Sequence, residues 1–104
     1  MAQGVIHAFR RRLEVSEAIR FLSVLPVGLR ALFVADWDID EPKPPFEDRA
    51  VMTKEAQSLR LLHNFAPETA IRDVAIAVRR NLDETALDRI LATLPQGAMQ
   101  FWQL

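Results

Sequence analysis

Apolar residues recur at helical spacing along almost the whole chain. Steps of four residues connect Val5, Phe9 and Leu13, and the same steps connect Val74, Val78 and Leu82. Such spacing places apolar side chains on one face of a helix, and no segment alternates apolar and polar residues as a strand does. The sequence therefore predicts an all-α fold. Its seven predicted helices span residues 3–13, 15–25, 26–36, 49–65, 67–81, 84–94 and 96–103.

The pattern repeats itself with an offset of 69 residues. Residues 5–28 align with residues 74–97 without a gap, and ten of the 24 aligned positions are identical. Both copies end in Leu-Pro-x-Gly, at Leu25 and Leu94, where the proline is suited to the first turn of a new helix. We interpret this as one domain, residues 1–104, with two pseudo-symmetric helical repeats. Repeat one spans residues 3–36, a linker spans residues 37–48, and repeat two spans residues 49–104.

The two repeats differ in their number of predicted helices. Repeat two begins with the helix at 49–65, whereas no helix precedes residue 3 in repeat one. A repeat that lacks a helix exposes the face which that helix would have covered. The sequence therefore predicts an open, partner-binding face on the first helix, formed by Val5, Phe9 and Leu13. Alternatively, the proline-containing linker folds back, and Trp37 and Phe46 cover this face.

A second candidate for a partner-binding surface lies near the C-terminus. Phe101 and Trp102 are adjacent aromatic residues on the last predicted helix. Aromatic side chains of this kind are frequent anchors of protein interfaces. The alternative is that both belong to the hydrophobic core.

Composition excludes several classes of function. The net charge is −1, so the basic excess of a general nucleic-acid binder is missing. The chain has no cysteine, which excludes disulfides and thiolate chemistry and is typical of a cytoplasmic protein. No apolar run approaches the roughly 20 residues of a membrane span. We therefore expect a cytoplasmic protein that binds neither nucleic acid nor membrane.

Charged residues suggest two kinds of binding site, each with a simpler alternative. An arginine pair recurs in both repeats, at Arg10-Arg11 and at Arg79-Arg80, and such pairs can clamp an anion. They can also be helix arginines whose stems cover apolar surface. Acidic residues stand at positions 1, 3, 5 and 12 of a calcium-loop pattern. A glutamate takes the place of the glycine that this pattern requires at position 6. The alternative is that these acidic residues belong to a solvated linker. These residues are Asp36, Asp38, Asp40 and Glu47.

The chain offers little for catalysis or metal binding. Its two histidines, His7 and His63, are far apart in sequence and lack a ligand motif, so we expect structural roles. No hydroxyl residue lies in a nucleophile motif, and three glycines are too few for a phosphate-binding loop. We expect no cofactor and no metal. The sequence favours a non-catalytic interaction or scaffold protein that forms a homodimer or binds another protein. The alternative is a small-ligand or anion site between the repeats at Arg11 and Arg80.

The repeat junctions resemble those of a bacterial family. Its members are small all-helical proteins catalogued as a domain of unknown function. Leu25-Pro26 and Leu94-Pro95 match the family's junction, and Trp37 matches the residue after the third helix. The resemblance implies an all-helical fold with two repeats, of which the first is shortened here at its N-terminus. It implies no activity.

Overall fold

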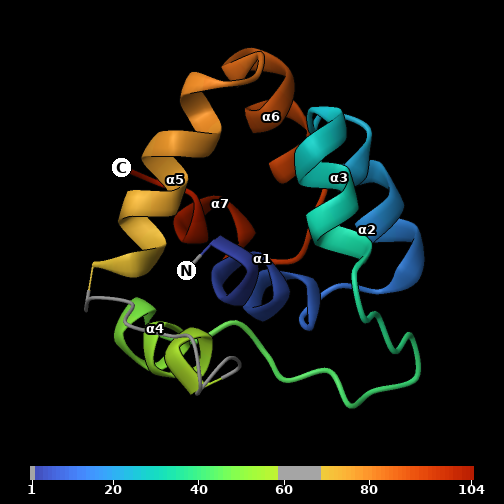
Figure 1. The fold of residues 1–104 in the computed structure, drawn as a ribbon, viewed down its shortest axis with the longest axis vertical. Coiled ribbons are helices and arrows are strands. Elements are labelled where there is room, and N and C mark those ends of the chain that lie inside the picture. The colour runs from blue at the N-terminus through green and yellow to red at the C-terminus, as the bar shows by residue number, and fades with distance from the viewer. Residues whose placement is uncertain (1, 59–68) are drawn as a thin grey trace.

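The computed structural model describes residues 2–58 and 69–104, and within these residues the secondary structure is entirely helical (Figure 1). The prediction of an all-α fold is therefore confirmed. The helices are α1 (Ala2–Arg10), α2 (Val15–Leu22), α3 (Val27–Val34), α4 (Arg49–Ser58), α5 (Ala70–Arg80), α6 (Glu84–Leu91) and α7 (Ala98–Phe101). The predicted helices 49–65 and 67–81 extend into residues 59–68. That part of the prediction, together with His63, lies outside the described residues.

Helix α1 lies at the centre of the fold (Figure 1). It contacts α4, α3 and α5, while α2 contacts α6. All but the first two residues of α1 are buried, although its sequence includes a histidine and an arginine. The chain therefore wraps around its own first helix.

Backbone hydrogen bonds recur at the 69-residue offset of the sequence. Helices α2 and α6 begin and end at corresponding residues. The last turns also correspond, because the Leu25 amide donates to the Leu22 carbonyl and the Leu94 amide donates to the Leu91 carbonyl, each at 3.1 Å. A spatial symmetry between the two repeats stays a prediction.

Several helices are shorter than the sequence predicts. The predicted helix 15–25 ends at Leu22, and residues 23–25 form a tighter turn with bonds to the third preceding residue. The reason is Pro26, because a proline disfavours helical geometry in the residue before it. Pro26 itself has extended backbone angles, and α3 begins at Val27.

The core is centred on the ring of Phe9. Its centroid lies 4.7 Å from that of Phe21, 5.0 Å from Phe101 and 5.3 Å from Trp102. Phe46 of the linker lies 5.7 Å away. Rings from both ends of the chain and from the linker therefore join one cluster.

The predicted open face on the first helix is wrong. Val5 and Phe9 are fully buried and Leu13 is 2% exposed. Helix α4 covers this face, and the approach is so close that a Cβ on Gly4 would lie 2.6 Å from the Ala56 carbonyl oxygen. Phe46 adds its ring, as the alternative prediction expected. Phe101 and Trp102 are also fully buried, so all five predicted partner-binding residues belong to the core.

Candidate functional site

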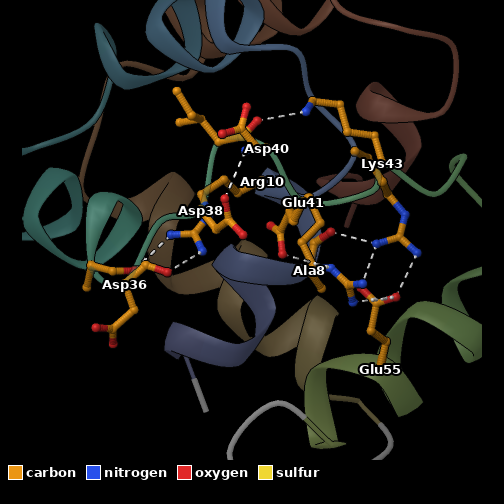
Figure 2. A network of polar contacts seen from close by, with 12 residues as sticks. Ala8, Arg10, Asp36, Asp38, Asp40, Glu41, Lys43 and Glu55 are labelled. Atoms are coloured by element: carbon orange, nitrogen blue, oxygen red, sulfur yellow. Dashed lines mark hydrogen bonds and ion pairs between the residues drawn. The ribbon is translucent and has the colours of Figure 1, made fainter.

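Arg10 is a buried side chain that bonds to the end of α3. Its guanidinium donates to the carbonyls of Phe33, at 2.6 Å, and Ala35, at 2.9 Å. Figure 2 shows Arg10 directed towards Asp36, whose carbonyl accepts at 3.5 Å. The Trp37 ring centroid lies 5.7 Å from the guanidinium carbon. Desolvation lowers the pKa of Arg10, while the carboxylates of Glu41 and Asp36 raise it. These contacts give Arg10 a structural role.

Arg11 and Arg12 hold the linker and α4 against α1 (Figure 2). The Arg12 side chain is 1% exposed, forms an ion pair with Glu55 at 2.8 Å and donates to the Pro45 carbonyl at 3.0 Å. Arg11 lies 3.3 Å from Glu55 and 3.7 Å from Glu41. The arginines of repeat one therefore already bind protein carboxylates and carbonyls.

The arginine pair of repeat two divides between two environments. Arg79 donates to the Trp102 carbonyl at 2.8 Å and to Asp88 at 3.0 Å, and it also reaches Glu84 at 3.4 Å. Arg80 is exposed. Acidic and carbonyl acceptors already bind Arg10, Arg11 and Arg79, so the geometry gives no support to the predicted anion site at Arg11 and Arg80.

The acidic linker residues do not gather into a ligand group. Asp38 accepts a hydrogen bond from the Asp40 amide at 3.0 Å, and Glu47 lies 4.0 Å from Arg12. In the part of the chain that the structure describes, no three His, Asp or Glu side chains are placed to hold a metal ion. His7 Nε2 lies 2.9 Å from the Leu32 carbonyl, which links α1 to α3.

A mainly apolar hollow on the described surface lies beside α5. This hollow, here named the α5 groove, has a volume of about 410 Å³. Among the described residues, its lining comprises Ala2, Pro26, Gly28, Leu29, Asp73, Val74, Ala77, Val78 and Asn81. Val74 and Val78 are almost fully buried, whereas Ala77 and Asn81 are exposed. In Figure 1, α5 lies on the left of the view and α3 on the right, with α1 below and between them.

The α5 residues that line the α5 groove correspond, through the 69-residue repeat, to the residues on the face of α1 that α4 covers. Its five α5 residues each follow, by 69 positions, one residue of α1 or of the turn after it. Those counterparts are Gly4, Val5, Ala8, Phe9 and Arg12. Ala8 is fully buried, and the side chain of Arg12 is 1% exposed. Ala77 and Asn81, at the corresponding positions, face solvent.

Gly28 and Gly97, the glycines of the two Leu-Pro-x-Gly junctions, also differ in whether neighbouring residues pack against them. A Cβ on Gly97 would lie 2.6 Å from the Cβ of Phe46, because the linker packs against that glycine. A Cβ on Gly28 would meet no atom within 4 Å. One site is therefore filled by α4 and Phe46, whereas none of the described residues fills its counterpart at Gly28 and α5.

The lining of the α5 groove suits an apolar helix better than a polar small molecule. Asp73 is the one charged residue among its described lining residues, and it accepts a hydrogen bond from Thr69 Oγ1 at 2.9 Å. Asn81 donates to the Ala77 carbonyl at 2.7 Å. Small-ligand sites usually combine an apolar lining with several converging polar groups, and this groove has few.

A second apolar surface adjoins the groove on the outside of α3. Val27, Ala31 and Val34 are exposed at spacings of four and three residues, which places them along one face of the helix. Val27 is 78% exposed and Val34 is 44% exposed. We name these three residues the α3 stripe. Val27 lies between Pro26 and Gly28, which both line the α5 groove, so the stripe and the groove are neighbours.

The sequence contained part of this site. The spacing of Val74 and Val78 predicts their apolar face, and the part of the predicted helix 49–65 beyond Ser58 lies outside the described residues. The α3 stripe was missed, although Val27, Ala31 and Val34 are spaced as one helical face. Single exposed apolar residues are common on protein surfaces, so only the position of the stripe beside the groove makes it notable.

Comparison with known proteins identifies a matching family. A family model described as "Uncharacterized conserved protein (DUF2267)" matches residues 1–101. No curated protein and no solved structure matches the chain. None of the helices formed by the described residues has the length and apolar character needed to cross a membrane.

Proposed function

The chain belongs to the DUF2267 family, and we propose that it is a non-catalytic interaction protein that self-associates through the α5 groove. One observation carries the proposal: within residues 2–58 and 69–104 no helix fills the groove, whereas its counterpart 69 residues earlier is filled by α4. The filled site shows that side chains of this pattern bind a helix. The open site therefore has the character of a helix-binding surface without its helix.

A second copy of the chain is the occupant that the surface favours. In a twofold dimer, the same patch on both copies must be complementary to itself. The α5 groove and the α3 stripe satisfy this condition, because a hollow and a raised apolar face adjoin at Val27 and Gly28. Each copy can then supply the helix that the other copy lacks.

The test is the molar mass in dilute solution, measured by light scattering over a range of concentrations. The expected mass at tens of micromolar is twice the monomer mass of 11.9 kDa. Ala77→Glu places a carboxylate in the groove and is expected to give a monomer. Ala50→Glu is the matched control, because Ala50 is also exposed but lies on α4, and it is expected to remain dimeric. A monomeric wild-type chain at every concentration, or a dimer unaffected by Ala77→Glu, would overturn the proposal.

A further inference from the structure

We infer that the α3 stripe of one copy binds in the α5 groove of the other, with Arg30 of each copy paired with Asp73 of its partner. This inference rests on the proposed function, because it specifies the contact by which the chain self-associates. It commits to one helix as the occupant and to one ion pair that fixes its position.

The lengths of the two surfaces match. Along α5, the groove runs from Asp73 to Asn81, which corresponds to about 12 Å at 1.5 Å per residue. From Val27 to Val34, helix α3 rises over seven such steps, about 10 Å, and therefore fits within the length of the groove. Its stripe from Val27 to Val34 presents the spacing with which amphipathic helices bind in grooves.

The charges also match. Asp73 is the one charged residue among the described lining residues of the groove, and Arg30 is the one charged residue of α3. Arg30 is exposed, and its Nε donates to the Leu25 carbonyl at 2.7 Å, which holds the guanidinium at the edge of the stripe. A carboxylate in an apolar groove and a cation beside an apolar stripe form a complementary pair.

The filled site suggests where the two helices come closest. Helix α4 approaches α1 closely at Gly4, where the Ala56 carbonyl leaves no room for a side chain. The residue at the corresponding position of α5 is Asp73, whose side chain prevents the same approach. The nearest small residue in the groove is Ala77, and the small residue at the middle of the stripe is Ala31. We therefore place the crossing at Ala31 and Ala77, with Arg30 within reach of Asp73.

Charge reversal tests the ion pair. Arg30→Glu and Asp73→Arg are each expected to raise the dimer dissociation constant about tenfold or more, because like charges then meet at the interface. The double variant Arg30→Glu/Asp73→Arg restores opposite charges and is expected to return the constant to within about threefold of the wild-type value. Sedimentation equilibrium gives these constants, and thermal unfolding of each variant shows whether the fold is retained.

Cross-linking provides a second test that does not depend on Arg30, whose bonds to its own chain also support the fold. The chain has no cysteine, so the variant Ala31→Cys/Ala77→Cys has only the two introduced thiols. Their Cα atoms must come within about 7 Å for a disulfide to form. Mild oxidation is expected to give a covalent dimer, whereas the control Ala31→Cys/Ala50→Cys is expected to stay monomeric on a non-reducing gel.

The outcomes separate this inference from the proposed function. A wild-type chain that is monomeric at all concentrations overturns both. In the second case, the wild-type chain is a dimer and Ala77→Glu dissociates it, but the double charge reversal gives no rescue and Ala31→Cys/Ala77→Cys gives no cross-link. That result overturns only the assignment of the α3 stripe as the occupant. Rescue together with the cross-link supports it.

Discussion

Arg10 and Arg79 stand 69 positions apart, and each donates a hydrogen bond to the carbonyl of a residue 23 positions further along the chain. The acceptors are Phe33, at 2.6 Å, and Trp102, at 2.8 Å. Phe33 lies near the end of α3, and Trp102 directly follows α7. Corresponding bonds therefore tie α1 to the end of α3 and α5 to the end of α7.

Replacing Arg10 is expected to cost more stability than replacing Arg79. Arg10 is 4% exposed, and Arg10→Met leaves the carbonyls of Phe33 and Ala35 without this donor. We expect the free energy of unfolding to fall by about 2–3 kcal/mol, the cost of unsatisfied buried acceptors. Arg79→Met removes hydrogen bonds that are partly exposed, so the free energy of unfolding is expected to fall by only about 1 kcal/mol. Urea unfolding followed by circular dichroism measures both changes, and equal losses would contradict the difference in burial.

A methyl group on Gly4 is expected to destabilise the protein, because its Cβ would lie 2.6 Å from the Ala56 carbonyl oxygen. Gly4→Ala should lower the free energy of unfolding by about 1–3 kcal/mol, as overpacking does elsewhere. Gly28→Ala is the control, because its Cβ would meet no atom within 4 Å, and alanine favours a helix over glycine by about 0.5–1 kcal/mol. Chemical unfolding at low protein concentration is the measurement. A stabilised Gly4→Ala variant would show that α4 does not approach α1 this closely.

Glu55 is expected to contribute strongly to stability because its ion-pair partner, Arg12, is buried. The Arg12 side chain is 1% exposed, and Glu55→Ala leaves that cation only the Glu47 carboxylate, at 4.0 Å, which should cost up to about 3–5 kcal/mol. The double variant Arg12→Met/Glu55→Ala removes the charge as well and should lose less. Glu84→Ala removes the exposed partner of Arg79 and should change the free energy of unfolding by less than about 1 kcal/mol. If the double variant is less stable than Glu55→Ala, the buried charge of Arg12 is not the cause of the lost stability.

Leu25 and Leu94 precede the two prolines and are buried, with exposures of 3% and 8%. Truncating either to alanine is expected to lower the free energy of unfolding by about 2–5 kcal/mol, through lost burial and the cavity left behind. Leu104→Ala provides the matched control, because Leu104 is 61% exposed, and it should have almost no effect. Thermal and urea unfolding of the three variants test this. A loss below about 1 kcal/mol at Leu25 or Leu94 would place that side chain outside the core.

Local structure was predictable where it depends on neighbours in the sequence. Helices α2 and α6 begin at the residues that the apolar spacing predicts, Val15 and Glu84. At α6 the reason is local, because Asp83 accepts hydrogen bonds from the Thr85 and Ala86 amides, as an aspartate directly before a helix does. The ends of the helices were less predictable, because the turn at residues 23–25 continues the helical spacing of apolar residues.

The position of α4 could not be derived from the same spacing. Both candidate faces carry apolar residues four apart, at Val5 and Phe9 and at Val74 and Val78. The choice between them depends on long-range contacts: Gly4 allows a close approach of Ala56, and Arg12 pairs with Glu55. Asp73 and Asn81 offer neither contact at the corresponding positions. The amphipathic pattern shows that a face is apolar and does not show which helix covers it.

The central position of α1 has a consequence for synthesis on the ribosome. Helix α1 is made before the residues that bury it, which come from α4 and from Phe101 and Trp102. Phe9 cannot be enclosed until Phe101 and Trp102 have been synthesised and have left the exit tunnel. The nascent chain must therefore keep an apolar helix uncovered while roughly ninety further residues are added, a number set by the positions of Phe9 and Trp102.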